Sequence, residues 1–222
     1  MPSATVENYL KRIYLEQERV PGALVSLGKL ADSMRVVPGT VTTMVKGLSE
    51  AGLLEYEPRQ GVKLTRRGEK LALSILRKHR LLELFLFSVL HVDWAEVHDE
   101  AEELEHALSD KLLNRIDDFL GNPQFDPHGD PIPSSTGEVL ERELRSLHDC
   151  RKGEGVTVAA ITDQSPAFLD YARNHGIIPD AAVRIVSIDS VADAISVSTG
   201  ENQTVTMGGV AARKVLVKMA EG

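Results

Sequence analysis

The chain has 222 residues, of which 42% are hydrophobic, so it is long enough for more than one domain with a packed core. Its single cysteine, Cys150, excludes an intrachain disulfide, which suits a reducing compartment, and we expect a cytoplasmic protein. We expect no signal peptide, because the N-terminus lacks a basic start followed by an apolar core. We expect no membrane span, because the longest apolar stretches, such as residues 81–90, are interrupted by Glu83 and Ser88.

The net charge of −8 at first argues against a nucleic-acid partner. The distribution of charge along the chain instead favours such a partner. Residues 1–80 hold 14 Lys/Arg and 8 Asp/Glu, whereas residues 81–222 hold 11 Lys/Arg and 25 Asp/Glu. A basic N-terminal unit joined to an acidic remainder predicts that the protein binds DNA through its N-terminal part alone.

The N-terminal third has the element order of a winged helix. Apolar spacing and breaking residues predict a first helix that ends before Pro21, a second at 27–34, a third from Pro38 to Gly52, and hairpin strands at 53–57 and 62–65. Any small helical domain with a hairpin is the alternative. Turn length, helix order and basic charge together favour the winged helix.

The middle of the chain predicts a group of longer helices. Thr65 as a cap predicts one helix from Thr65 to about Leu90, and an Asp93-x-x-Glu96 capping box predicts a second that continues through 109–120. Apolar spacing predicts a further helix over 136–148. The residues expected to face inward are Val97, Ala101, Leu104 and Leu108 in the second helix and Leu140, Leu144 and Leu147 in the last.

After residues 152–155 the pattern changes to short strand-like runs. They lie at 156–161, 182–188, 194–198, 204–207 and 214–218, with a short helix at 167–175 between the first two. Several short strands in about seventy residues predict a small β-barrel.

Histidines and carboxylates recur at helical spacing in the middle of the chain. They are His79 and Glu83 on one predicted helix, and His98, Glu102, Glu105 and His106 on the next. Such spacing puts each set on one side of its helix, which is how helical bundles hold divalent metals. The alternative is a solvated acidic face that only forms salt bridges. Burial of several carboxylates without a cation would be costly, which favours the metal site.

Motifs for catalysis are missing from the sequence. It contains no H-E-x-x-H, G-x-S-x-G, P-loop or G-x-G-x-x-G pattern, and Cys150 has no motif around it. We therefore expect a protein that is not an enzyme, with a structural or surface thiol at Cys150. A metallohydrolase built on the helical part remains an alternative, and it would need an open metal position.

Three segments, Lys78–Glu83, Val97–His106 and Asp126–Pro133, together resemble the diphtheria-toxin-repressor family of iron- and manganese-dependent regulators. The resemblance covers nearly the whole chain. It implies a mainly α fold with small β parts in three domains: a winged helix-turn-helix DNA-binding domain at 1–73, a helical dimerisation and metal-binding domain at 74–148, and an SH3-like C-terminal β-barrel at 149–222. It also implies a homodimer.

The resemblance implies two metal sites per subunit. The primary site would use Asn8 with Glu102, Glu105 and His106. The second would use His79, Glu83 and His98, with Asp126, His128 and Asp163 as further candidates and Gln164 as a weaker one.

The metal would be Mn²⁺ or Fe²⁺. Iron-type members tend to carry Met and Cys at the positions of Asn8 and Glu102, so Glu102 indicates the oxygen-rich site that Mn²⁺ prefers. Asn8 departs from both types: it is neutral where manganese-type members tend to carry Asp, and it offers a carbonyl oxygen where iron-type members offer the sulfur of Met. Alternatives stay open: Asn8 as an ordinary helix N-terminal residue, Asp126 and Asp163 as turn residues, and His128 as a surface histidine.

For DNA, Thr40, Thr42 and Thr43 match the family's recognition positions near the start of the third helix. Lys46, Arg59 and Lys63 would contact phosphates. The resemblance implies a repressor with metal as corepressor, a palindromic operator and control of metal-uptake genes. A winged-helix regulator that senses an organic ligand is the alternative, and its DNA binding would be indifferent to chelators.

Overall fold

The computed structural model describes residues 3–20, 22–200 and 203–220. Contacts divide the chain into two compact units. The first unit comprises the chain up to residue 79 with residues 104–110 and 133–138, and the second comprises 80–103, 111–132 and the chain from 139 onward. In the described residues, no helix is both long and apolar enough to cross a membrane.

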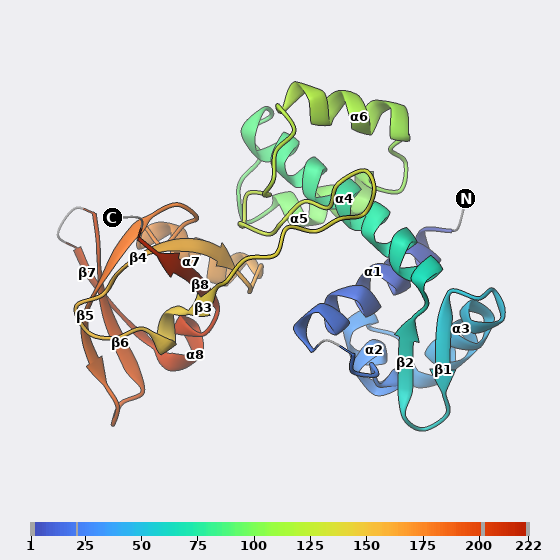
Figure 1. The fold of residues 1–222 in the computed structure, drawn as a ribbon, viewed down its shortest axis with the longest axis horizontal. Coiled ribbons are helices and arrows are strands. Elements are labelled where there is room, and N and C mark those ends of the chain that lie inside the picture. Colours follow the sequence, from blue (N-terminus) through green and yellow to red (C-terminus); the bar gives the residue numbers. More distant parts are fainter. Residues whose placement is uncertain (1–2, 21, 201–202, 221–222) are drawn as a thin grey trace. The chain divides into compact units, whose positions relative to one another are not determined.

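The N-terminal elements form the predicted winged helix (Figure 1). They are α1 (Ala4–Arg19), α2 (Leu27–Met34), α3 (Pro38–Glu50), β1 (Leu54–Glu57) and β2 (Gly61–Leu64). The two strands pair antiparallel as a hairpin. One apolar core unites them, with Leu10 and Ile13 of α1, Leu30 of α2, Val41 of α3 and Val62 of β2 all buried.

Local chemistry sets the ends of these helices. Ser3 and Ser26 accept hydrogen bonds from the backbone N–H groups of Val6 and Lys29, which caps α1 and α2. Pro38 is the first residue of α3, where its missing N–H costs nothing. The third helix therefore begins where the sequence predicts.

The long helix α4 (Arg66–Ser88) follows, and Thr65 caps it by accepting from the N–H of Gly68 at 3.1 Å. The next helix, α5 (Val97–Leu104), follows a turn in which the Asp93 carboxylate accepts from the N–H of Ala95 at 2.9 Å. Both predicted capping residues are thus confirmed as acceptors.

The helix predicted to run on through 109–120 is interrupted. The chain leaves α5 after Leu104 and starts again as α6 (Asp110–Phe119). The intervening Glu105 and His106 side chains bind partners far away in the sequence, and these contacts override local helix propensity. Leu104, predicted to be buried, is 44% exposed.

The helix predicted over 136–148 is wrong. Gly137 has a left-handed φ of 88°, which breaks a helix at its first turn. The Arg142 guanidinium donates to the carbonyl of Gly129 and lies 4.3 Å from the Phe125 ring centroid, and these contacts favour an extended segment. The segment ends in the short strand β3 (Arg145–Ser146) and the 3₁₀ turn η1 (Leu147–Asp149). Leu147 is buried as predicted, whereas Leu140 is 47% exposed.

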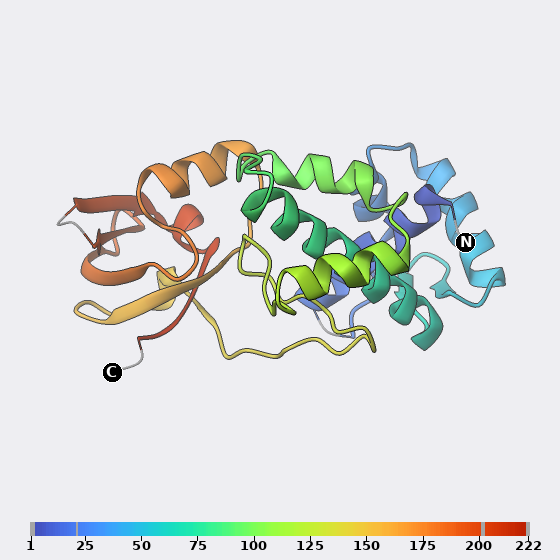
Figure 2. The same ribbon diagram turned by 90° about the horizontal axis from the view of Figure 1, so that it is seen from above.

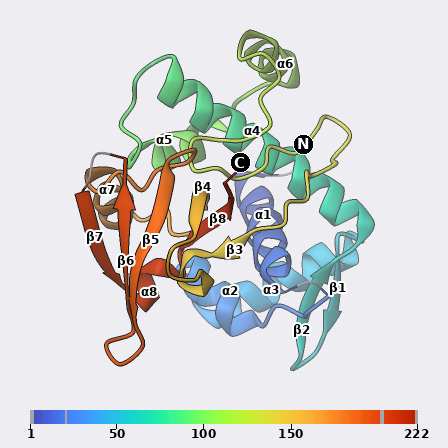
Figure 3. The ribbon, with the colours of Figure 1, turned by 60° about the vertical axis from the view of Figure 1, so that its left-hand side comes forward.

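The C-terminal strands match the predicted runs. They are β4 (Gly155–Ile161), β5 (Ala182–Asp189), β6 (Ala194–Thr199), β7 (Gln203–Gly208) and β8 (Val215–Met219). With β3 they form one antiparallel sheet in the order β3-β8-β4-β5-β6-β7 (Figure 3). The helix α7 (Pro166–Asn174) lies beside the sheet and buries Leu169 and Ala172 in its core (Figure 2). The four-residue helix α8 (Gly209–Ala212) joins β7 to β8. The C-terminal part is the SH3-like domain that the resemblance implies.

Candidate metal centre

Glu105 lies at the centre of a buried polar cluster in the first unit. Its side chain is 1% exposed. Its Oε1 lies 2.6 Å from Nζ of Lys11, and its Oε2 lies 2.7 Å from Nδ1 of His79. The Glu105 carboxylate is therefore held on both oxygens, by a residue of α1 and by a residue of α4.

His106 is oriented by a carboxylate from α1. Its Nδ1 lies 2.7 Å from Oε2 of Glu7. Because a carboxylate only accepts, the neutral His106 ring donates from Nδ1 and keeps its lone pair on Nε2. That Nε2 is buried, lies 3.4 Å from Oε1 of Glu105 and has no hydrogen-bond partner among the described residues.

Asn8 contributes a second buried ligand-type atom. It lies on α1 between Glu7 and Lys11, and its Oδ1 has no hydrogen-bond partner in the part of the chain that the structure describes. Glu102 lies on α5 one turn before Glu105 and is half-buried. We call Glu7, Asn8, Lys11, His79, Glu105 and His106 the Glu105 cluster. A buried imidazole nitrogen without a hydrogen-bond partner lies beside the Glu105 carboxylate, and α1 adds a buried amide oxygen, and donors of these types fit a hard divalent cation.

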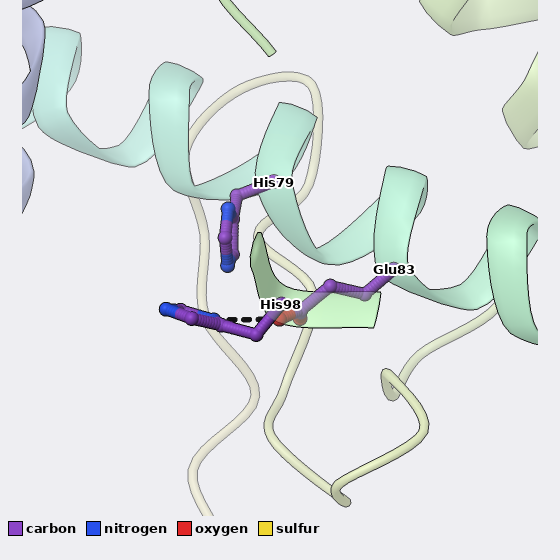
Figure 4. A group of neighbouring side chains, drawn as sticks. All are labelled: His79, Glu83 and His98. Atoms are coloured by element: carbon purple, nitrogen blue, oxygen red, sulfur yellow. Dashed lines mark hydrogen bonds and ion pairs between the residues drawn. The ribbon is translucent and has the colours of Figure 1, made fainter. Parts of the chain in front are cut away.

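A second cluster surrounds Glu83, which is 1% exposed, in the second unit. Oε1 of Glu83 lies 3.0 Å from Nδ1 of His98. Ligand atoms of Glu83, Asp126 and His128 all lie within 4.8 Å of one another. Figure 4 shows the Glu83–His98 contact, with His79 one turn earlier on the same helix α4. We call Glu83, His98, Asp126 and His128 the Glu83 cluster.

Burial makes the Glu83 cluster electrostatically costly, and Nε of Arg80, 3.7 Å from Oδ2 of Asp126, compensates its carboxylates only in part. Burial, reinforced by the nearby charges of Asp130 and Glu83, raises the pKa of Asp126 well above its ordinary value. Burial likewise lowers the pKa of His128, which favours the neutral ring that binds metals. Neither Oδ2 of Asp126 nor Nδ1 of His128 has a hydrogen-bond partner among the residues described. These residues fit a divalent ion.

The loop that carries Asp126 and His128 is fixed in place. The other Asp126 oxygen, Oδ1, accepts from the N–H groups of His128 and Asp130. The carbonyl of His128 accepts from the N–H of Ile161 on β4 at 2.9 Å. The ring of Trp94 stacks on His128 with centroids 5.6 Å apart. The loop therefore presents its two ligand atoms from a rigid position.

These positions decide between several of the sequence alternatives. Glu105 is buried, so for this residue the solvated acidic face is wrong, whereas Glu100 and Glu103 of the same stretch are exposed. His128 is fully buried rather than a surface histidine.

Asp163 occupies a different setting. Its Oδ2 lies 2.5 Å from Nζ of Lys214, and its Oδ1 caps the N–H of Ser165. The neighbouring Gln164 donates to Oδ2 of Asp130. Among the described residues, Asp163 is not part of a three-residue group of potential ligands. Its role as a metal ligand stays a prediction.

The predicted DNA-contacting threonines lie on α3. Thr40 and Thr43 are exposed and Thr42 is half-buried. The hydroxyls of Thr42 and Thr43 donate to the carbonyls one turn earlier, at Pro38 and Gly39. Each hydroxyl oxygen keeps its acceptor capacity, and each methyl group remains available for a thymine methyl.

The predicted phosphate contacts lie on α3 and on the wing. Lys46 is exposed on α3, and Arg59 is exposed at the tip of the hairpin with a left-handed φ of 70°. Lys63 on β2 pairs with Glu55 on β1 at 2.8 Å, and this contact raises the pKa of Lys63. A phosphate near Lys63 would have to compete with Glu55.

The sequence prediction missed Glu7 and Lys11. Both bind residues about a hundred positions away, so no local pattern reveals the contacts. One signal was present: Lys11 follows directly after the apolar pair Tyr9-Leu10, next to the buried stripe of α1, where a cation needs a partner.

Comparisons with known proteins cover most of the chain. Residues 1–62 match the family described as "Iron dependent repressor, N-terminal DNA binding domain". Residues 65–134 match "Iron dependent repressor, metal binding and dimerisation domain", and residues 145–219 match the FeoA domain.

Individual relatives are similar over most of their length. The iron-dependent repressor IdeR of Mycobacterium tuberculosis is 30% identical over 213 residues, which cover 90% of this chain and 91% of that protein. A solved structure described as a manganese-dependent transcriptional repressor in complex with manganese is 41% identical, with a TM-score of 0.89 over 97% of this chain and 100% of the other. The manganese regulator SloR is 30% identical, with a TM-score of 0.78 over 97% and 98%.

Proposed function

Because this chain belongs to the family of iron-dependent repressors, we propose that it is a transcriptional repressor that needs a divalent metal ion as corepressor. One observation carries this proposal. The Glu105 cluster joins α1 of the winged helix to α4 and to the segment after α5 through buried groups, and Asn8 Oδ1 and His106 Nε2 in it have no described hydrogen-bond partner. The role we propose is regulatory rather than catalytic.

Two ions per subunit fit the two clusters. Asn8, Glu102, Glu105 and His106 would hold the first. Glu83, His98, Asp126 and His128 would hold the second, with His79 and Asp163 as further candidates. The bound ion supplies positive charge that compensates the buried carboxylates and links the side chains around it.

Carboxylates of the protein orient the histidine rings that are candidate metal ligands. Glu7 holds His106, Glu105 holds His79, and Glu83 holds His98, each through Nδ1. In a neutral ring that donates from Nδ1, Nε2 is the nitrogen that carries the lone pair, and for His106 this atom has no hydrogen-bond partner among the described residues. The tautomers are thereby fixed by carboxylates before any ion arrives.

Coupling to DNA follows from the place of the Glu105 cluster. Glu7 and Asn8 are on α1, which packs in one core with the recognition helix α3. Ordering α1 against the dimerisation domain would fix two recognition helices of a homodimer at the spacing of successive major grooves, roughly 34 Å. By linkage, metal and DNA each tighten the other's binding by the same factor.

We infer that Mn²⁺ is the physiological metal, with Fe²⁺ as the competing assignment. The candidate ligands are carboxylate, amide and imidazole groups without a thiolate or thioether among them, and such a set suits Mn²⁺. A cytoplasmic repressor of this kind would act on a palindromic operator and control metal-uptake genes.

The test is the substitution Glu105→Gln, which keeps the side-chain shape and removes its charge. DNA binding is measured by fluorescence anisotropy with Mn²⁺ and with chelator. Metal-stimulated binding, which in coupled systems gains roughly 5–150-fold, should disappear. Glu100→Gln, an exposed change of equal charge on α5, should leave the stimulation intact. A full metal response in Glu105→Gln contradicts the site assignment.

A further inference from the structure

The Glu105 cluster already contains a cation. We propose that the Lys11 ammonium occupies the Glu105 carboxylate in the metal-free protein and that metal binding displaces it, so that Lys11 sets the metal concentration at which this repressor responds. The inference rests on the proposed function, because it concerns the regulation of the same site.

The contacts of Lys11 are those of an internal counter-ion. Its Nζ lies 2.6 Å from Oε1 of Glu105 and 3.5 Å from Nδ1 of His79. The Lys11 residue is 6% exposed and the Glu105 residue 1%. A lysine is seldom buried without a carboxylate partner, because desolvation of its charge must be compensated. The α1 helix therefore delivers a positive charge to the carboxylate that a metal would use.

Lys11 and an incoming metal would compete for one oxygen. Oε1 of Glu105 faces the Lys11 ammonium at 2.6 Å and Nε2 of His106 at 3.4 Å. A cation held by both Glu105 and His106 would share Oε1 with the ammonium, and the two like charges would repel each other strongly inside the protein. The flexible lysine stem lets the ammonium withdraw and leave the carboxylate to the metal.

The pair also stabilises the protein before metal arrives. Removal of one partner from a buried ion pair leaves an uncompensated charge and is strongly destabilising. With Lys11 in place, Glu105 is compensated, so the metal-free subunit keeps this cluster together. The same contact lowers the affinity for metal, because each binding event must first break it.

The decisive variants are Lys11→Met and Lys11→Arg. Methionine keeps most of the apolar stem without the charge, whereas arginine keeps the charge. Lys29→Met is the matched control, because Lys29 forms a 2.5 Å pair with the buried Glu16 in the same domain, away from the cluster. Mn²⁺ alone is titrated into each full-length protein by calorimetry, and the midpoint of thermal unfolding is measured with chelator.

We expect Lys11→Met to bind the Glu105-cluster ion about tenfold more tightly, from the loss of one competing charge, and to unfold at lower temperature with chelator. Lys11→Arg and Lys29→Met should stay within about threefold of the wild-type affinity. Unchanged or weaker Mn²⁺ binding by a folded Lys11→Met protein overturns the inference. Absence of Mn²⁺ binding by the wild-type protein would instead refute the proposed function, and with it this inference.

A measurement on the wild-type protein covers the case in which Lys11→Met does not fold. Lysines are acetylated briefly with and without Mn²⁺, and the modified sites are quantified by mass spectrometry. Displacement predicts that acetylation of Lys11 rises with Mn²⁺ while that of Lys29 does not change. Equal or lower acetylation of Lys11 in metal-loaded protein contradicts the displacement.

Discussion

Nδ1 of His106 lies 2.7 Å from Oε2 of Glu7, a residue 99 positions earlier in the chain. This contact joins α1 to the segment that follows α5, and it aims the remaining ring nitrogen at Glu105. Glu7 thus positions the ring of His106, which is a candidate metal ligand. The relation also explains why Glu7 is half-buried although it lies in the exposed first turn of α1.

Glu7→Gln should weaken metal binding without abolishing it. An amide can accept from His106 only through its oxygen and loses the charge that raises ligand basicity. Loss of such a partner costs roughly 10–100-fold in metal affinity. Mn²⁺ calorimetry is the measurement, with Glu18→Gln, an exposed change on the same helix, as the control. Equal affinities for Glu7→Gln and wild type would show that Glu7 does not position His106.

Asn8→Asp should strengthen metal binding at the Glu105 cluster. The buried Oδ1 of Asn8 has no described hydrogen-bond partner, and a charged oxygen there binds a hard cation better. We expect about a tenfold gain in Mn²⁺ affinity and a lower unfolding temperature with chelator, because the added charge is buried. Asn114→Asp, an exposed substitution on α6, should change neither quantity. If Asn8→Asp leaves the affinity unchanged, Asn8 is only a helix residue.

Asp126→Asn should have opposite effects in the two metal states. Burial raises the pKa of Asp126, so the ionised carboxylate destabilises the metal-free fold. The neutral amide should raise the metal-free unfolding midpoint by about 2–4 °C, equivalent to roughly 1 kcal/mol. It should also remove metal binding at the Glu83 cluster, which the fluorescence of the only tryptophan, Trp94, stacked on His128, reports. A wild-type fluorescence response to Mn²⁺ in Asp126→Asn would contradict this assignment.

The raised pKa of Asp126 also predicts that the stability of the metal-free protein depends on pH. A carboxyl with a raised pKa in the folded state holds its proton more tightly when folded than when unfolded. The stabilisation that the protonated Asp126 carboxyl gives the folded state is fully present below the pKa of the unfolded state. It is lost as the pH rises through the raised pKa of the folded state. Chemical denaturation with chelator should therefore show wild-type stability falling over that range. Asp118→Asn, an exposed control, should fall like the wild type, whereas Asp126→Asn should not.

Lys46 and Thr43 should affect DNA binding differently. Lys46→Ala should reduce the slope of log affinity against log salt by about 0.9, because one phosphate contact is lost on every sequence. Thr43→Ala should leave that slope unchanged and alter the preferred base at one position of each half-site. Lys152→Ala, in the C-terminal domain, is the control for charge. An unchanged salt slope for Lys46→Ala would remove Lys46 from the interface.

Sequence reasoning predicted the elements whose signals are local. The winged helix, α4 and the C-terminal strands follow from apolar periodicity, capping residues and turns. Helical spacing also selected Glu83, His98, Glu105 and His106, since the ligands of each set lie one or two turns apart. Long-range contacts contribute to both failures, and at 136–148 the left-handed Gly137 adds a local cause. At 136–148 and after Leu104, contacts with distant segments, such as that of Arg142 with Gly129, outweigh the local preference for helix.

The partners of the ligands could not be predicted in this way. Glu7 and Lys11 are ordinary i, i+4 charges on α1, and a surface salt bridge is the usual meaning of that spacing. Only the fold shows that Lys11 instead binds Glu105 and that Glu7 binds His106. The proposed domain limits at 73/74 and 148/149 and the ligand role of Asp163 remain predictions.

The central claim is that metal switches DNA binding on. The most direct test selects bound duplexes from a random DNA pool with Mn²⁺, with Fe²⁺ under anaerobic conditions, and with chelator alone. We predict that a palindrome is enriched with metal only, and more strongly with Mn²⁺ than with Fe²⁺. Equal enrichment under all three conditions would leave a DNA-binding protein without a metal switch, and would contradict the account.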